Sequence, residues 1–471
     1  MIGSEKILLT ILGALIVSFI LNIFDNILLM GFIFCALLAF CTSLFLVKVK
    51  VMNKGLFLLF SLIFLFHIII VLFVYYANFQ PFGNGLGDFV GYDQNAKIIY
   101  SRLHNGDFSV GGLESTSHYY AVLLGYIYFF TAPSMLIGQL FNAWLSALIS
   151  VLAYFIVIEI FGKNKYALLV GVIVALYPSL LFFGSLLLKD ALITFLSLVA
   201  VLLIIKLIKN FSYGFFAIFY LISGLIFHFR FYIGFAVIFT FVISWLIFYN
   251  FDIKKKFIYV LIFIALFGFL PQVFMIDRAG YWGNILFKQY LNQKTISYYR
   301  NVAYAPEPQY VKEPENKPSQ LENNFSENQD TSGSTFNIDT NFKNPLNFIR
   351  GYSLSFVYSV LSPLPWQIKY KRQLYAFAET IPWYILLFFI IKGLIINFKR
   401  YYKKITPLLI FSFLILGNIA LFINNFGIIT RIRIPAVICL LCLLPFGIEG
   451  RNIFYDCTKK IYINFKKWKQ K

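Results

Sequence analysis

Apolar stretches long enough to cross a bilayer occur at least twelve times in this chain, and Lys and Arg cluster on alternate connections between them. A helix needs about 20 apolar residues to cross the hydrocarbon core of a membrane. The chain has 471 residues, is 60% hydrophobic and has a mean hydropathy of +0.78, which exceeds what a soluble core of this size requires. The pattern therefore predicts an all-α polytopic membrane protein.

The predicted spans also divide the chain into regions. The regions are an N-terminal hairpin (1–54), a core (55–276) with a first external loop (78–133), an external region (277–374), and C-terminal spans with a basic tail (375–471). The twelve predicted spans are 6–24, 27–47, 55–77, 134–161, 166–185, 191–208, 212–228, 232–250, 257–276, 375–397, 405–424 and 434–449.

The basic residues orient these spans. With the N-terminus in the cytoplasm, the cytoplasmic pieces hold 23 of the 40 Lys and Arg residues and 5 of the 20 acids, a net charge of +18, against +2 outside. Cytoplasmic loops rich in Lys and Arg follow the positive-inside rule, so both termini are predicted in the cytoplasm of a plasma-membrane protein. Basic residues scattered over short loops indicate contacts with membrane lipid and no nucleic-acid partner.

Three segments outside the spans have their own character. Residues 118–131 are apolar and Tyr-rich but too short to span, which predicts an interfacial helix. Residues 305–344 are rich in Pro, Glu and Asn, which predicts a flexible linker or, alternatively, a flap over a substrate. The aromatic, amphipathic segment 346–368 predicts a second interfacial helix.

Motifs for several chemistries are missing from the sequence. It has no Walker motif, no metal-binding Cys/His cluster, no Gly-x-Ser-x-Gly elbow and no dinucleotide fingerprint. We therefore expect no cofactor and assign no metal ligands, although the sequence leaves a divalent metal open. The spans are nearly free of ionisable groups, which argues against an ion-coupled transporter.

Two acidic constellations face outward in this topology. Asp88 and Asp93 lie in the first external loop, where a partly desolvated carboxylate can act as a general base; the alternative is that both are turn or capping acids. Lys189 and Asp190 lie in a short turn between two spans. Lys189 can meet a phosphate and Asp190 can orient a sugar or acceptor, whereas helix N-capping by Asp190 is the simpler alternative.

A third constellation is basic. It comprises His228, Arg230, Arg350, Arg431 and Arg433, all at predicted external ends of spans or helices. Arg suits bidentate capture of phosphate, while snorkelling of the side chain to the interface is the alternative.

The order of these features resembles the GT-C superfamily of membrane glycosyltransferases, particularly the bacterial branch similar to protein O-mannosyltransferases and aminoarabinose transferases. The resemblance is best over 78–230 and rests on the acidic loop, the interfacial segment, Phe141-Asn-Ala-Trp, Tyr177-Pro-Ser and Leu188-Lys-Asp. Farther on, the segments 362–366 and 425–435 look like members found in surface-polysaccharide assembly.

The resemblance implies transfer of a sugar from a polyprenyl-phosphate donor to a glycan, lipid or protein acceptor on the outer face of the membrane. Asp88 matches the Asp that acts on the acceptor hydroxyl, because it follows Gly87 and precedes Tyr92, which we place among the substrate contacts. Asp190 matches the acidic position of the second small loop, and Asp93 or Asp190 would support Asp88.

The implied chemistry needs positive charge to stabilise the departing phosphate. The external Arg residues are the first candidates, and Lys189 is a further one. We therefore predict that Asp88, Asp190, Arg230 and the Arg431/Arg433 pair converge in one outward-facing cavity. Two alternatives remain. A polysaccharide polymerase or ligase of lipid-linked oligosaccharides would rely on external Arg, and a flippase or transporter would form no glycosidic bond.

Overall fold

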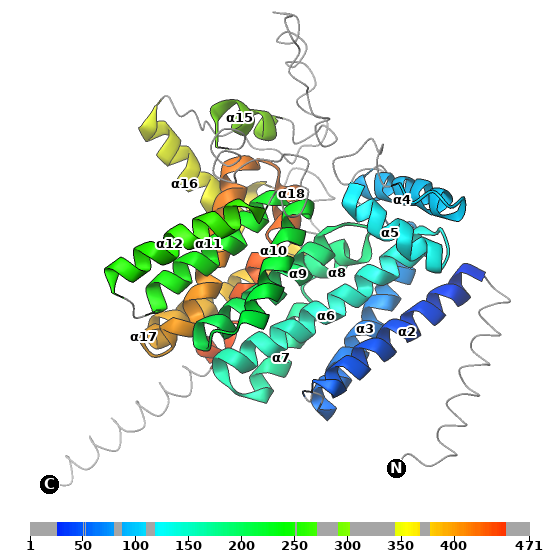
Figure 1. The fold of residues 1–471 in the computed structure, drawn as a ribbon, viewed down its shortest axis with the longest axis horizontal. Helices are drawn as coiled ribbons and strands as arrows, with labels where there is room; N and C mark the ends of the chain where they lie inside the picture. Colours follow the sequence, from blue (N-terminus) through cyan, green and yellow to red (C-terminus); the bar gives the residue numbers. More distant parts are fainter. Residues whose placement is uncertain are drawn as a thin grey trace, which may run out of the picture. The chain divides into compact units, whose positions relative to one another are not determined.

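The computed structural model describes residues 26–49, 51, 53–79, 87–109, 118–249, 252–270, 291–301, 344–367 and 377–448. All regular elements within these ranges are helices (Figure 1). The predicted first span (6–24), the linker (305–344) except Asn344, and the basic tail lie outside the described residues, as does the end of the predicted span 257–276.

The chain folds into two compact units. Unit 1 consists of Met1–Val151 and Leu180–Leu192, and unit 2 consists of Leu152–Ser179 and Ile193–Lys471.

Unit 1 contains two long apolar helices, two short helices and parts of three more. The complete helices are α2 (Asn26–Lys48), α3 (Lys54–Tyr76), α4 (Asp88–His104) and α5 (His118–Phe130). The partial ones are α6 (Met135–Phe161), α8 (Pro178–Ser185) and α9 (Asp190–Lys209). Trp144 of α6 donates a hydrogen bond from Nε1 to Oγ1 of Thr42 in α2 at 2.9 Å, which ties two apolar helices together.

The sequence analysis treated residues 78–117 as a loop, but the structure places α4 within them. Its buried apolar residues recur at helical spacing and are Phe89, Tyr92, Ala96, Ile99 and Leu103. This stripe packs on α5, and the two helices lie side by side in Figure 1. The polar outer face lowers the average hydropathy of this segment, so the search for long apolar stretches could not reveal the helix.

Unit 2 is built mainly from apolar helices. Besides its parts of α6, α8 and α9, it contains α7 (Asn164–Ala175), α10 (Tyr213–Phe229), α11 (Phe231–Phe248), α12 (Ile253–Gly268), α15 (Gln293–Asn301), α16 (Pro345–Leu361), α17 (Phe377–Phe422), α18 (Phe426–Ile432) and α19 (Ile434–Leu441).

Helix α17 runs through most of both predicted spans, 375–397 and 405–424, without interruption. Yet Glu379 binds Arg433, and Ser412 Oγ donates to the carbonyl of Ala436 at 3.0 Å. A straight helix would separate Glu379 and Ser412 by about 50 Å. Because both meet the same short segment, α17 folds back on itself into two arms.

Two predicted spans are broken. The helices α7 and α8 meet at 55°, where Pro178 begins α8, and α18 meets the helix that starts at Ile434 at 51°. Six described helices are long and apolar enough to cross a membrane, or eight if each bent pair forms one span. The chain is thus a multi-pass membrane protein, whereas the expected number of twelve spans is not reached by the described residues.

Helix α16 lies along the second arm of α17, although the sequence predicted a helix flat on the membrane surface. The rings of Phe356 and Phe413 are 5.3 Å apart, and a Cβ built on Gly417 would lie 2.8 Å from the hydroxyl of Tyr352. As the numbering rises in α16 it falls in α17, so the two run antiparallel. Small buried side chains, Ser355 and Ser359, allow this close packing.

Candidate functional site

The acidic helix α4 is fastened to α5 by a buried carboxylate. Asp93 is 6% exposed and accepts hydrogen bonds from Tyr128 Oη at 2.8 Å and from Lys97 Nζ at 2.7 Å. Burial and the neighbouring Asp93 carboxylate raise the pKa of Tyr128, so its phenol stays protonated and acts as a donor. Asp93 therefore holds two helices together, and its oxygens are already engaged by the chain itself.

Asp88 lies in a different environment. It is exposed and occupies the first position of α4, after Gly87 at the N-cap. A carboxylate in the first turn of a helix is stabilised by the helix dipole. Both alternatives of the sequence analysis thus remain physically reasonable for Asp88, whereas Asp93 is an internal anchor.

A chain of aromatic and amide contacts runs inward from α4. The ring of Tyr92 meets that of Tyr120 edge-on, with centroids 5.2 Å apart. Tyr120 is fully buried, and its hydroxyl donates to Oδ1 of Asn142 at 3.1 Å. Burial raises the pKa of Tyr120, and the charge of Asp190 raises it further. Four segments of unit 1 therefore meet around one phenol: α4, α5, α6 and the start of α9.

The Lys189–Asp190 turn is tied to the same chain. Nδ2 of Asn142 donates to the carbonyl oxygens of Leu186 and Leu188, at 2.8 Å each. The two residues that follow, Lys189 and Asp190, are only 4% and 5% exposed. The first two predicted constellations, 88–93 and 189–190, are thus joined through Tyr92, Tyr120 and Asn142 within unit 1.

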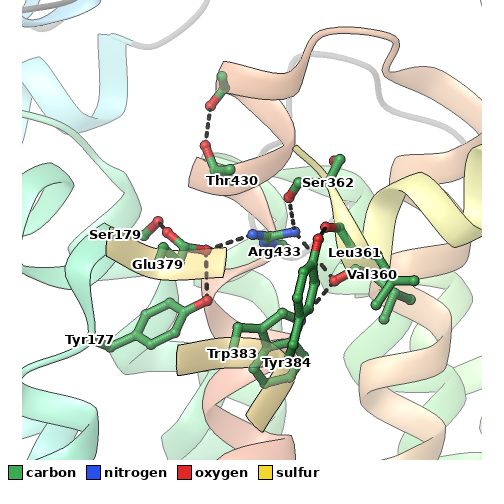
Figure 2. Close-up of polar contacts among 11 residues, drawn as sticks. Tyr177, Ser179, Val360, Leu361, Ser362, Glu379, Trp383, Tyr384, Thr430 and Arg433 are labelled. Atoms are coloured by element: carbon green, nitrogen blue, oxygen red, sulfur yellow. Dashed lines mark hydrogen bonds and ion pairs between the residues drawn. The ribbon is translucent and has the colours of Figure 1, made fainter. Parts of the chain in front are cut away.

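Unit 2 contains a buried ion pair. Arg433 Nη2 contacts Glu379 Oε1 at 2.6 Å, and their side chains are 0% and 5% exposed (Figure 2). Tyr177 Oη donates to the same oxygen at 2.6 Å, and Ser179 Oγ binds the other carboxylate oxygen. Tyr177 lies at the break between α7 and α8, and Arg433 lies at the break between α18 and α19. The two broken helices therefore meet at one pair of opposite charges.

Arg433 of this pair also helps to cap α16, together with two aromatic residues. The last carbonyls of a helix have no partner within it and require donors from elsewhere. Trp383 Nε1 donates to the carbonyl of Val360 at 2.8 Å, and Tyr384 Oη donates to that of Leu361 at 2.6 Å. Arg433 Nη1 donates to the carbonyl of Ser362 at 2.7 Å. Figure 2 shows these donors grouped around the end of α16.

The ion pair lies where helices begin and end. Glu379 is the third residue of α17, and Arg433 joins α18 to α19. Both residues belong to segments that are apolar enough to cross a membrane, Ala378–Phe422 and the bent pair that begins at Phe426. The two charges are thus buried at helix ends within candidate spans of unit 2.

The other predicted basic residues belong to unit 2 and lie at helix ends or on short helices. Arg230 separates α10 from α11, half-buried, and Nη1 donates to Tyr232 Oη at 2.9 Å. His228 is in the last turn of α10 and Arg431 is on α18. Arg350 is exposed on α16. The predicted convergence of these residues with the acids of unit 1 stays a prediction.

Arg433 has a different environment from the one expected for a phosphate ligand. It is completely buried, and both terminal nitrogens bind Glu379 or backbone carbonyls of the chain. A guanidinium in this arrangement is an internal partner, since a donor phosphate would have to displace those contacts. The sequence analysis took this Arg as external because it follows a polar stretch.

Sequence reasoning also missed several of the groups that organise these centres. Glu379 was detectable, because it is a lone acid in an apolar span. Asn142 and Tyr177 were quoted only for the family resemblance. Arg300 is 5% exposed and contacts Ser355 Oγ at 3.2 Å. The sequence could not distinguish it from an ordinary exposed residue, because the segment around it is polar and charged.

Comparison with known proteins adds no identification: no model of a protein family matches this chain, and no curated protein matches it. Among the described residues, no three His, Cys, Asp or Glu side chains are grouped as metal ligands.

Proposed function

We propose that this chain is a membrane glycosyltransferase that moves a sugar from a polyprenyl-phosphate donor to a glycan, lipid or protein acceptor on the outer face of the membrane. The observation that carries the proposal is the network of unit 1, which joins the acidic helix α4 to the Lys189–Asp190 turn through Tyr120 and Asn142. An enzyme that aligns a general base with a donor needs such a rigid link between segments.

The environments of the acids suggest how the work is divided. Asp88 is exposed and can take the proton of an acceptor hydroxyl, while Asp93 is occupied with Tyr128 and Lys97 and positions α4. The acceptor oxygen then bonds to the anomeric carbon of the sugar as the bond from that carbon to the phosphate oxygen breaks. Polyprenyl phosphate leaves with the bonding electrons, and its negative charge requires a basic side chain or another donor nearby.

The test compares two exposed acids close in sequence, in cells that lack the protein and produce a variant instead. Asp88→Asn should reduce the extended surface glycan, or the glycosylated acceptor, by about 10²–10⁴-fold in rate, because the base is removed and its shape is kept. Asp107→Asn is the control, since Asp107 is exposed beyond the end of α4 and its carboxylate accepts hydrogen bonds from Ser109 in its own turn. Full glycan synthesis by well-expressed Asp88→Asn protein would end the proposal.

A second function is favoured by one specific observation. Ionisable residues inside a span, at the ends of broken helices, are typical of transporters and flippases. The pair Glu379–Arg433 has that setting, which weakens the sequence argument that the spans lack such groups. A transporter would move lipid-linked sugar across the membrane without new glycosidic bonds, and Asp88→Asn would leave this movement unchanged. Measuring both the lipid-linked sugar on each face and the glycan product separates the two functions.

A further inference from the structure

Asn142 is a polar residue in an otherwise apolar helix, and its side chain is completely buried. A buried amide is costly unless its hydrogen-bonding groups are satisfied. Asn142 meets that requirement with three hydrogen bonds: two from Nδ2 to backbone carbonyls and one from Tyr120 to Oδ1. These partners come from outside its own helix, so the side chain connects segments.

The partners fix the orientation of the amide. Nδ2 faces two carbonyl oxygens, those of Leu186 and Leu188, which can only accept hydrogen bonds. Oδ1 faces the hydroxyl of Tyr120, which can donate. Turning the amide over would place an acceptor against two acceptors. No apolar residue can replace these contacts, and an ionised Asp would face both carbonyls with negative charge.

The turn that Asn142 binds needs these donors. Helix α8 ends at Ser185 and α9 begins at Asp190, so the carbonyls of Leu186 and Leu188 lie outside both helices. The carbonyl of Leu186 also accepts from the amide of Leu188 at 2.9 Å. The turn is buried, with Leu187 at 0% and Leu188 at 3% exposure. In apolar surroundings an unsatisfied carbonyl costs several kcal/mol. The side chain of Asn142 therefore supplies two hydrogen-bond donors to the carbonyls of this buried turn.

We propose that Asn142 is a positioning residue that sets the place of the Lys189–Asp190 turn relative to the acidic helix α4. The inference rests on the proposed function, because it concerns the same site. From the amide the link runs through the Tyr120 hydroxyl to the ring of Tyr92 on α4, a path with 3.1 Å and 5.2 Å contacts. Asn142 itself reaches no substrate, and it acts by fixing the residues that do.

The expected consequence follows from alignment. A displacement of about 1 Å in a catalytic group can reduce the rate about 10²-fold. Asn142→Leu removes all three hydrogen bonds at similar volume and should lower glycosyl transfer by about 10²-fold. The control is Gln139→Leu, which also removes a buried amide from α6; Oε1 of Gln139 accepts no hydrogen bond within the described residues. The control should retain transfer close to that of the unchanged protein.

The pH dependence of transfer by Asn142→Asp distinguishes a positioning role from a merely structural one. When ionised, the new carboxylate cannot donate to the turn, whereas a protonated carboxyl regains one donor and keeps an acceptor for Tyr120. The transfer rate of this variant, divided by that of the unchanged protein, should therefore rise as the pH falls. The titratable side chains around Asn142, those of Tyr120, Lys189 and Asp190, are present in both proteins, so the ratio removes much of their contribution. The ratio for Asn142→Leu should stay flat, and a flat ratio for Asn142→Asp would overturn the proposal.

Hydrogen–deuterium exchange on the purified full-length protein in detergent gives an independent measurement. In Asn142→Leu the peptide covering 180–192 should exchange faster than in Gln139→Leu, while peptides of α17 should be unchanged. Unchanged exchange in 180–192 would overturn the inference, and faster exchange with full transfer would make Asn142 structural only. If the unchanged protein transfers no sugar, the proposed function fails, and the exchange of 180–192 still decides whether Asn142 holds the turn.

Discussion

Units 1 and 2 bury polar groups in different ways. In unit 1, carboxylates and phenols lie on the short helices α4 and α5, and Asp88 at the start of α4 is exposed. In unit 2, Glu379 and Arg433 neutralise each other at helix ends, with almost no exposed surface. Exposed acid is available for chemistry, whereas a closed pair stabilises packing and specifies which helices meet. The exposed acid of the proposed site thus belongs to unit 1, and the closed ion pair belongs to unit 2.

The largest effect expected from this contrast is on the ion pair. Glu379→Gln leaves Arg433 buried without a counter-charge and should cost about 3–5 kcal/mol of stability, seen as loss of folded protein in detergent. Adding Arg433→Met to Glu379→Gln removes the uncompensated charge and should restore much of the loss. The matched change in unit 1, Asp88→Asn, should leave stability within about 0.5 kcal/mol. A double variant less stable than Glu379→Gln alone would contradict the anchoring role.

A smaller effect is expected where helices touch through their backbones. A Cβ built on Gly447 would lie 2.7 Å from the carbonyl carbon of Phe389 in α17, so Gly447→Ala should force the helices apart and cost about 1–3 kcal/mol. On α4 the opposite holds, because a Cβ on Gly91 meets nothing within 4 Å. Gly91→Ala should stabilise α4 by about 0.5–1 kcal/mol. Thermal unfolding of the two variants measures both changes in stability. Equal shifts of the melting temperature would mean that the two helix surfaces do not differ in how closely they are packed.

The two partners of Asp93 should also differ. Tyr128→Phe removes a buried hydrogen bond and should cost about 1–2 kcal/mol, because a charged acceptor loses a donor. Lys97→Met should cost no more than about 0.5 kcal/mol, since the Lys97 side chain is 48% exposed and pairs within one helical turn. Denaturation in detergent compares them. A larger loss for Lys97→Met would show that the exposed ion pair, and not the phenol, fastens α4 to α5.

Much of the membrane architecture could be predicted from local patterns. The spans at 27–47, 55–77 and 191–208 agree with α2, α3 and α9 to within a few residues, because hydropathy summed over about 20 residues is a strong signal. The short segment 118–131 is a helix of 13 residues, as expected from its length. The amphipathic helix α4 was missed because its signal is periodicity rather than average hydropathy.

The candidate site was predictable in part. The acids 88, 93 and 190 were selected by sequence, and the structure connects the segments that carry them, but it gives Asp93 a structural partner in Tyr128. Arg433 was selected for an external phosphate, and the structure buries it against Glu379. Both revisions depend on residues 35 and 54 positions away along the chain. No local pattern contains that information.

The sequence by itself determined that the chain is an α-helical, multi-pass membrane protein, because the transfer of apolar side chains into lipid depends on composition within each segment. Only the tertiary structure decided where α7 and α18 break, that α17 folds back, and which charges are closed and which are exposed. These outcomes depend on hydrogen bonds and ion pairs between distant segments, whose strength is set by distance and burial. Asn142 illustrates the difference, since its amide is visible in the sequence and its three partners are visible only in the fold.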